Sequence, residues 1–234
     1  MGRFAVILPA AGRSTRFGDP SQKKIYADLN GRAVWLRAVE AFAGHADVGQ
    51  ILIAIAEEDR AMFETRHRDD VARLGVEILI GGAERSDTVA AALRRIKPEC
   101  DFVAVHDAAR PCLTPAQVAA VFEAALEHGA ALLAAPVVET VKRASADRLS
   151  RETVPRDNLY LAQTPQVFRR DWLVEAHRAR AASGGAATDD TQLVEALGHP
   201  CAIVPSNAMN LKITTQDDMA LAQAILQIQA REDA

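Results

Sequence analysis

The sequence predicts an α/β fold: a single domain built on an open, mainly parallel sheet, with a β-arm that protrudes from it. Three observations support this prediction. Short apolar runs of about strand length recur along the chain, helical patterns lie between them, and one charged segment, 139–160, interrupts the alternation. Alternating strands and helices are typical of βαβ units, whose strands are parallel.

The predicted strands are mostly apolar on both faces, as expected of parallel strands that helices cover on both sides. They are residues 4–8, 50–56, 76–80, 102–105 and 130–138. The first of them runs into Pro9 and a Gly/Arg-rich loop, so it is interpreted as a buried strand and not as the core of a signal peptide.

The predicted helices lie where apolar residues recur at three- and four-residue spacing, within 34–42, 89–96 and 118–126. Residues 114–117 (Thr-Pro-Ala-Gln) have the pattern of a capping box with proline at the first helical position. Residues 215–218 (Thr-Gln-Asp-Asp) predict the start of the last helix, because acids favour a first turn. The stretch 181–187, rich in Ala and Gly, is interpreted as a helix end and a loop.

The segment 139–160 is charged and weakly periodic, with Thr and Val near its ends and a polar turn, Ala-Asp-Arg, at 146–148. This pattern predicts a hairpin that leaves the domain. An isolated two-stranded hairpin is only marginally stable in water. We therefore expect a dimerisation arm that forms a homodimer, with a plain surface excursion as the alternative.

Composition narrows the class of protein. The chain of 234 residues has 27 Lys and Arg against 31 Asp and Glu, a net charge of −4, which argues against nucleic-acid and membrane-surface partners. No apolar run approaches the roughly 20 residues that cross a bilayer. The three cysteines have no C-x-x-C spacing, so neither a disulfide framework nor a zinc knuckle is expected, and a cytoplasmic location fits best.

A basic loop follows the first strand. Residues 9–18 are small or cationic apart from Phe17, and Lys23 and Lys24 follow, which places four cations within the twelve residues 13–24 against one acid, Asp19. Small residues let backbone N–H groups approach a phosphate, and the cations neutralise it. A solvated basic loop is the alternative. The loop has neither a Walker motif nor G-x-G-x-x-G, so it would be a different kind of nucleotide loop.

Two more loops follow predicted strands. Asp107 ends the fourth strand beside Arg110, where a carboxylate could hold Mg²⁺ against phosphates; alternatively it only caps a turn and pairs with Arg110. His106 is interpreted as structural, because no second His or Cys lies at metal-ligand spacing. The small, polar loop 81–88 suits contact with a flat base, although it could equally be an ordinary turn.

Later residues read as surface or cap when taken singly: Arg156 in the arm, a helix start at 188–190, and Lys212 beside a predicted short strand within 210–214. The chain shows no nucleophile motif and no convincing carboxylate pair. A phosphate monoester is already largely an oxyanion at pH 7 and needs no general base. Cations and Mg²⁺ could therefore catalyse its attack on a nucleotide phosphate.

The loops also carry motifs in a fixed order. These are P-A-A-G-x-x-x-R-x-G at 9–18, a lysine at 24, G-G-x-x-R-x-x-S/T-V at 81–89, V-H-D-A-A-R-P at 105–111, A-P-V-x-x-T-x-K at 135–142, R-x-x-L-x-x-x-Q-T-P-Q at 156–166, T-D-D at 188–190 and N-L-K-I-T at 210–214. Over nearly the whole chain they resemble the methylerythritol phosphate cytidylyltransferases of the non-mevalonate isoprenoid pathway. The register back from Leu29 favours Lys24 over Lys23 as the family's lysine.

The resemblance implies one Rossmann-like nucleotidyltransferase domain over 1–234, with 139–160 as its dimerisation arm. It implies transfer of CMP from CTP to 2-C-methyl-D-erythritol 4-phosphate, which gives 4-diphosphocytidyl-2-C-methyl-D-erythritol and pyrophosphate by in-line attack. The residues that would stabilise charge on the α-phosphate are Arg16, Lys24 and Lys212. Asp107 would hold Mg²⁺. The CTP-binding residues would be Pro9, Ala10, Ala11, Gly12, Gly82, Arg85 and Thr88. The acceptor-binding residues would be Arg110, Thr164 and Thr188, with Thr140 and Arg156 of the partner subunit.

Two alternatives remain open at this point. A ribitol 5-phosphate cytidylyltransferase would have almost the same loops. A nucleotide-binding regulator without activity is disfavoured, because it would not need Arg16, Lys24, Asp107 and Lys212 together.

Overall fold

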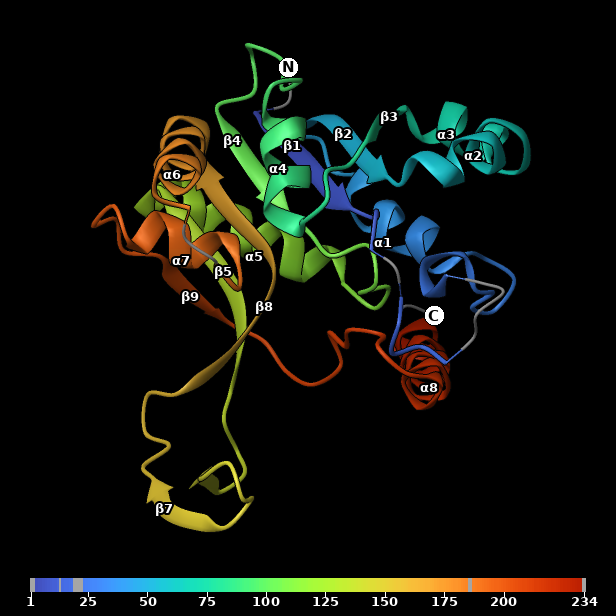
Figure 1. The fold of residues 1–234 in the computed structure, drawn as a ribbon. Helices are drawn as coiled ribbons and strands as arrows, with labels where there is room; N and C mark the ends of the chain where they lie inside the picture. The colour runs from blue at the N-terminus through green and yellow to red at the C-terminus, as the bar shows by residue number, and fades with distance from the viewer. Residues whose placement is uncertain (1–2, 13, 19–22, 185–186, 233–234) are drawn as a thin grey trace.

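A sheet forms the centre of the computed structural model, which describes residues 3–12, 14–18, 23–184 and 187–232. Within these residues the sheet has seven strands in the order β3-β2-β1-β4-β8-β5-β9 (Figure 1). The strands are β1 (Phe4–Pro9), β2 (Val48–Ile55), β3 (Val76–Ile80), β4 (Phe102–Val105), β5 (Ala130–Pro136), β8 (Tyr160–Arg169) and β9 (Ala202–Pro205). Only β8 runs antiparallel to its neighbours, so the prediction of a mainly parallel α/β sheet is confirmed.

Helices cover both faces of this sheet. On one face pack α1 (Val34–Ala43), α3 (Arg68–Leu74) and α5 (Pro115–His128); on the other pack α4 (Arg85–Leu93), α6 (Arg170–Ser183) and α7 (Asp190–Glu195). Successive residues of β1 point to opposite faces, so Val6 joins the cluster around Trp35 and Ile7 joins the cluster around Val89. A strand that is buried on both faces is therefore apolar throughout, as the sequence of β1 indicates.

The remaining elements are short, apart from the last helix. They are the 3-10 turns Lys24–Tyr26 and Glu57–Asp59, α2 (Arg60–Arg66) and α8 (Gln216–Glu232). Within the described residues, no helix combines the length and the apolarity that a membrane crossing requires. Arg13 and Asp19 of the predicted basic loop, and Gly185 and Ala186 of the predicted loop after α6, lie outside the described residues.

The helix starts follow the predicted caps. The Gln117 amide N–H donates to Thr114 Oγ1 (3.3 Å), and the Thr114 amide N–H donates to Gln117 Oε1 (3.1 Å), so the capping box of α5 is complete. At α8 the Thr215 amide N–H donates to the Asp218 carboxylate (2.8 Å). These bonds satisfy backbone donors that a helix leaves unpaired at its start.

The sheet differs from the prediction in three ways. The sequence did not predict β8, which inserts between β4 and β5, or the edge strand β9. It also wrongly predicted a short strand within 210–214. That segment crosses from β9 to α8 without strand structure, and the Ile213 amide N–H donates to the Ala109 carbonyl (2.8 Å). The Ile213 side chain is buried, but burial alone does not make a strand.

A bulge in β8 lies beside the strand ends that carry the predicted site. Leu132 of β5 pairs with Gln166 and Ala134 pairs with Ala162, so three residues of β8 face a single residue of β5. Such bulges turn side chains toward a site. Here the bulge includes Thr164 and brings it next to the end of β4.

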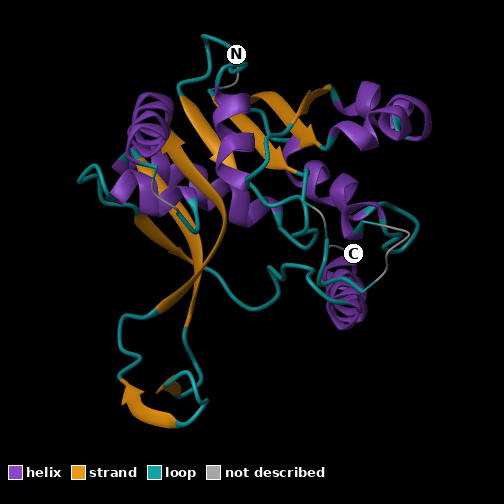
Figure 2. Cartoon of the chain, viewed as in Figure 1, coloured by secondary structure: helices purple, strands orange, loops and turns teal. Residues whose placement is uncertain are grey.

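The arm is a hairpin, as predicted. Figure 1 shows β5 and β8 leaving the sheet together and leading to β6 (Val141–Ala144) and β7 (Ser150–Val154), which form a separate two-stranded sheet. In Figure 2 the helices surround the large sheet and the hairpin stands apart from them. Most of its side chains are exposed. The arm's role in dimerisation is taken up below as a proposal.

A pair of glycines tests the packing between α5 and α6. Gly129 and Gly184 both end a helix in the left-handed region, but an added Cβ would collide with the Trp172 ring only at Gly129. Gly184→Ala is expected to lower the free energy of unfolding by about 1 to 2 kcal/mol. Gly129→Ala is expected to cost about 2 to 5 kcal/mol, because overpacking adds to the same backbone strain. Urea unfolding of both variants measures the difference, and equal losses would contradict it.

Candidate active site

Loops from the carboxyl ends of β1, β3 and β4 meet around a cavity of about 190 Å³. This edge of an open parallel sheet is where α/β proteins bind ligands. The lining residues are Pro9, Ala10, Ala11, Gly12, Ser14, Lys24, Ile25, Gly82, Ala83, Glu84, Arg85, Thr88, Asp107, Ala108, Ala109 and Lys212. The structure thus brings together all of the residues that the sequence assigned to CTP, together with Lys24, Lys212 and Asp107.

Close backbone packing shapes one wall of this cavity, which is called the nucleotide cavity below because it gathers the residues that the sequence assigned to CTP. A Cβ added to Gly81 would lie 2.7 Å from Ala11 Cβ, so the loops after β1 and β3 can touch only because residue 81 is glycine. The buried Thr88 hydroxyl accepts from the Gly82 N–H (3.0 Å) and donates to the Glu84 carbonyl (3.0 Å). Because its proton and one lone pair are used inside the loop, Thr88 acts here by fixing the loop's shape.

A cluster of cations borders the cavity. Lys24 is half-buried, and its amide N–H donates to Ser14 Oγ (3.3 Å), a contact that the sequence did not predict. Burial lowers the pKa of Lys24, and the nearby charges of Lys212 and Arg16 lower it further. Arg16 itself is exposed and does not line the cavity, although it lies close enough to affect Lys24.

Lys23 points elsewhere. Its ammonium group lies 2.7 Å from Asp59 Oδ2 and 2.9 Å from Glu58 Oε1, in a separate ion-pair cluster. Burial lowers the pKa of Lys23, but the hydrogen bonds and charges of Asp59 and Glu58 outweigh burial and raise it overall. The geometry therefore agrees with the register that favours Lys24.

Asp107 is buried among three cations. Its carboxylate lies 2.8 Å from Lys212 Nζ, 3.5 Å from Arg85 Nε and 3.6 Å from Arg110 Nε. Burial by itself would raise the pKa of Asp107, but the charge of Lys212, followed by Arg85 and Arg110, holds it well below its usual range. Asp107 is therefore a permanent anion and cannot serve as a general acid or base near neutral pH.

Backbone contacts place Lys212 and Asp107 opposite each other. The Ile213 side chain is fully buried, and the Ile213–Ala109 backbone bond ties the crossing segment to the loop after β4. The Arg110 guanidinium also donates to the Asn210 carbonyl (2.7 Å). The segment that carries Lys212 is therefore held by hydrogen bonds at Asn210 and at Ile213, before and after the lysine.

Asp107 also fits a metal ion in its chemistry. Within the described residues, no three His, Cys, Asp or Glu side chains lie close enough to bind a metal by themselves. Magnesium often takes only one or two carboxylates and completes its shell with substrate phosphates and water. The single ionised carboxylate of Asp107 matches a magnesium site of this kind. It does not match a site in which the protein supplies all of the ligands.

A second cavity of about 230 Å³ adjoins the first. It is lined by Arg85, Asp107, Arg110, Ala162, Gln163, Thr164, Gln166, Thr188, Asp189 and Lys212. Arg85, Asp107 and Lys212 line both cavities, so they mark the boundary between them. This second cavity contains Arg110, Thr164 and Thr188, the three residues of this chain that the sequence assigned to the acceptor, and it is called the acceptor cavity below for that reason.

Within the acceptor cavity, Arg110 and Thr188 differ in their burial and in their hydrogen-bond partners. Arg110 is only 9% exposed, and none of the described residues accepts a hydrogen bond from its Nε. Burial lowers the pKa of Arg110, although Asp107 opposes this effect. Thr188 is exposed, and its hydroxyl lies 3.2 Å from Gln192 Oε1.

The sequence missed a buried network behind the boundary. Asp190, 1% exposed, lies 2.6 Å from Arg85 Nη1 and 2.9 Å from His177 Nε2. Gln166 Oε1 accepts from the Asp190 and Thr191 amide N–H groups (3.2 and 3.1 Å). The T-D-D motif contains Asp190 and was the available signal, but a helix start accounts for an acid there equally well. Asp190 therefore holds the guanidinium that borders both cavities.

The structure does not bring the arm residues to either cavity of the same chain. Thr140 and Arg156 are exposed and are absent from the lining of both cavities described above. The Arg156 guanidinium donates to the Val138 carbonyl.

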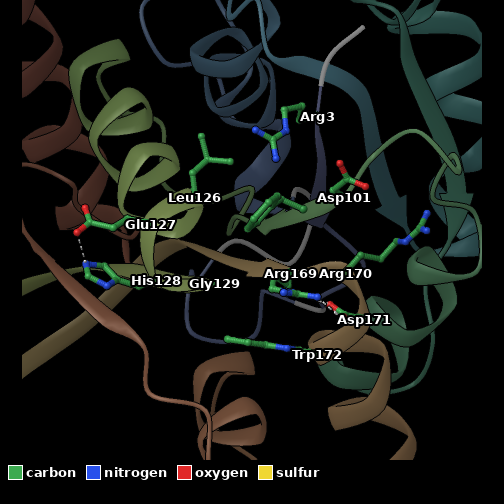
Figure 3. A pocket seen from close by; sticks show the side chains of 11 residues that line it. Arg3, Asp101, Leu126, Glu127, His128, Gly129, Arg169, Arg170, Asp171 and Trp172 are labelled. Carbon is green, nitrogen blue, oxygen red and sulfur yellow. Dashed lines mark hydrogen bonds and ion pairs between the residues drawn. The ribbon is translucent and has the colours of Figure 1, made fainter.

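The largest cavity described, about 630 Å³, lies at the opposite edge of the sheet (Figure 3). Its residues Arg3, Asp101 and Gly129 precede β1, β4 and β5, so it opens at the amino ends of those strands. Arg169 pairs with Asp171 there, and Arg170 donates to the Lys97 carbonyl (3.0 Å). These arginines of the cavity are therefore bonded within the protein. The size of the cavity is not by itself a reason to assign it as the active site.

Comparison with known proteins agrees with the geometry. Residues 4–228 match the family described as 2-C-methyl-D-erythritol 4-phosphate cytidylyltransferase. An enzyme of that name from Rhodopirellula baltica is 43% identical over 95% of this chain and 94% of its own, and one from Salinibacter ruber is 43% identical over 95% and 92%. The crystal structure of the Thermus thermophilus enzyme is 35% identical over 95% of this chain and 98% of its own, with a TM-score of 0.77. The 4-diphosphocytidyl-2C-methyl-D-erythritol synthase from Anaerococcus prevotii has a TM-score of 0.84 at 25% identity, over 97% and 96%. On this combined evidence the chain belongs to the 2-C-methyl-D-erythritol 4-phosphate cytidylyltransferase family.

Proposed function

We propose that the chain transfers CMP from CTP to 2-C-methyl-D-erythritol 4-phosphate and releases pyrophosphate. The observation that carries the proposal is the pair of adjoining cavities that share Arg85, Asp107 and Lys212. A nucleotide in one cavity and a phosphorylated acceptor in the other would meet at this cationic boundary, which is the geometry that two-substrate phosphoryl transfer needs.

The residues support direct attack without a covalent enzyme intermediate. An acceptor phosphate oxygen forms a bond to the α-phosphorus of CTP, and the bond to the bridging oxygen of the leaving pyrophosphate breaks. No proton has to be removed, because the acceptor phosphate is already an oxyanion. Lys24, Lys212 and Arg16 would stabilise the charge that develops at the α-phosphate.

Asp107 is the residue that would hold Mg²⁺, together with the CTP phosphates. The ion would supply charge neutralisation for the triphosphate and its leaving group. Lys212 now bonds to Asp107 (2.8 Å), and its side chain is 38% exposed, so it has room to turn toward a phosphate.

A metal titration tests this assignment. Activity is expected to vanish with a chelator and to return with added Mg²⁺, because a triphosphate and a carboxylate prefer a hard cation. Asp107→Asn is expected to raise the Mg²⁺ concentration needed for half-maximal rate and to lower kcat. Full turnover in metal-free buffer, or an unchanged titration in the variant, would reduce Asp107 to a turn residue paired with Arg110.

We propose further that the chain forms a homodimer through the arm, 139–160. Large apolar side chains are exposed on the arm and at its base, where Val138 is 70%, Leu161 61% and Leu149 55% exposed. Several large apolar side chains exposed on one protruding segment favour a protein interface that covers them. Thr140 and Arg156 would then bind the acceptor phosphate in the cavity of the partner subunit.

A pyrophosphate-release assay with CTP tests the function. We expect release with 2-C-methyl-D-erythritol 4-phosphate and much less with ribitol 5-phosphate, since the relatives named above carry the former acceptor in their names. Release with ribitol 5-phosphate alone would change the acceptor, and none with either would favour a regulator. A cytoplasmic location remains our expectation; none of the three cysteines, all within described residues, forms a disulfide.

A further inference from the structure

A chain of hydrogen bonds connects the core to the acceptor cavity. His106 Nε2 lies 3.1 Å from the Arg110 carbonyl oxygen, and His106 Nδ1 lies 3.1 Å from Thr164 Oγ1. The Asp107 amide nitrogen lies 3.0 Å from the same Thr164 oxygen. His106 is fully buried, whereas Thr164, 4% exposed, lines the acceptor cavity. The Thr164 hydroxyl at the cavity wall is thus hydrogen-bonded to His106 and to the Asp107 backbone.

The chemistry of each atom assigns the protons. A carbonyl oxygen can only accept, so His106 Nε2 must carry a proton. The ring is wholly buried, and its centroid lies 5.2 Å from that of the Phe42 ring; these surroundings favour a neutral imidazole with a bare Nδ1. The Thr164 hydroxyl must then donate its proton to Nδ1. The Asp107 N–H takes one of the two lone pairs of the hydroxyl oxygen, which leaves one.

We infer that His106 is a positioning residue that turns the Thr164 proton away from the acceptor cavity, so that Thr164 offers the substrate only a lone pair. This inference rests on the proposed function. A lone pair attracts a substrate hydroxyl and repels a phosphate oxygen. Thr164 would therefore accept a hydrogen bond from a hydroxyl of the sugar alcohol, while the cation Arg110 serves the phosphate.

The backbone supports the same orientation. Asn210 Nδ2 donates to the Thr164 carbonyl (2.9 Å) and to Gln163 Oε1 (3.0 Å), which holds the bulge of β8 in place. With the backbone bonded to Asn210 and the hydroxyl bonded to His106 and Asp107, Thr164 has little freedom to rotate. The direction of its lone pair is built into the protein before any substrate binds.

The first test reads the imidazole directly and needs no substrate. Long-range ¹H–¹⁵N correlation NMR of the full chain should show a ring protonated at Nε2 and bare at Nδ1, assigned to His106 by its loss in His106→Phe. A proton on Nδ1 would overturn the inference. Because this readout is independent of turnover, it stands even if the proposed function fails.

The second test uses acceptors that each lack one hydroxyl. Wild type should lose about 2- to 12-fold in kcat/KM with one such deoxy acceptor, the range expected for one neutral hydrogen bond. Thr164→Val should show no such preference. His106→Phe should behave like Thr164→Val, because without the imidazole the proton of the Thr164 hydroxyl can turn toward the cavity. Thr164→Ser and His106→Asn are the matched controls, since serine keeps the hydroxyl and the asparagine oxygen can replace Nδ1.

The pattern across acceptors separates the possible contacts. A loss in Thr164→Val that is equal for every acceptor would mean that Thr164 contacts the phosphate, and the inference would be wrong. Wild-type protein that releases no pyrophosphate with the full acceptor would instead refute the proposed function, and the NMR result would then decide the position of the proton alone.

Discussion

Replacing Lys24 with alanine is expected to lower kcat by about 10²- to 10³-fold and to change the KM for CTP much less. The Lys24 ammonium borders the nucleotide cavity, and burial together with the charge of Lys212 lowers its pKa. A cation held there before the reaction acts mainly on charge that develops in the transition state. Steady-state kinetics with varied CTP measures both constants.

The neighbouring lysine is the matched control. Lys23 has the same charge and length but is paired with Asp59 and Glu58, so Lys23→Ala should keep nearly wild-type kcat. A damaging Lys23→Ala and a mild Lys24→Ala would show that the register is wrong.

Mixing two inactive variants, Lys24→Ala and Arg156→Ala, is expected to restore activity after joint unfolding and refolding. If Arg156 acts in the cavity of the partner subunit, a mixed dimer has one site with both lesions and one with neither. Random pairing makes about half of the dimers mixed, and half of their sites are intact, so up to about a quarter of wild-type activity should return. Arg156→Ala alone should weaken acceptor binding and leave CTP binding nearly unchanged.

The activity of the refolded mixture is compared with the summed activities of the two parent variants. If Arg156 acts within its own chain, every site in every dimer carries one lesion, and refolding restores nothing. Recovery no greater than that sum, with subunit exchange confirmed by mass spectrometry, would rule out a shared site. The exposed position of Arg156, outside both cavities of its own chain, is the structural reason to expect recovery.

Local signals predicted much of the fold and of the site. The parallel strands β1, β3 and β4 are short apolar runs, and residues of the candidate site follow at their carboxyl ends. Residues 10–12 follow β1, and Asp107 comes two residues after the end of β4. Because such ends share one edge of the sheet, the sequence could predict that these loops meet.

Local sequence signals could not predict contacts between distant parts of the chain. Arg85 and Asp190 are 105 residues apart, and the packing of α4 against α6 and of α6 against α7 makes them partners. The strand β8 escaped prediction because Pro165 and its polar neighbours are unusual inside a sheet, and they are accommodated by the bulge. At 210–214, burial of a single isoleucine resembled a strand.

The position of β8 has a consequence for how the chain folds during synthesis. The strands β3-β2-β1-β4 form one parallel block and β5-β9 another, and β8 is the only strand that joins them within the described sheet. Until residues 160–169 leave the ribosome, β4 has an open edge, and such edges invite pairing with other chains. The same strand carries Thr164 and Gln166 into the acceptor cavity. The strand that closes the edge of β4 thus also begins the acceptor cavity, which Thr188, Asp189 and Lys212 complete later in synthesis.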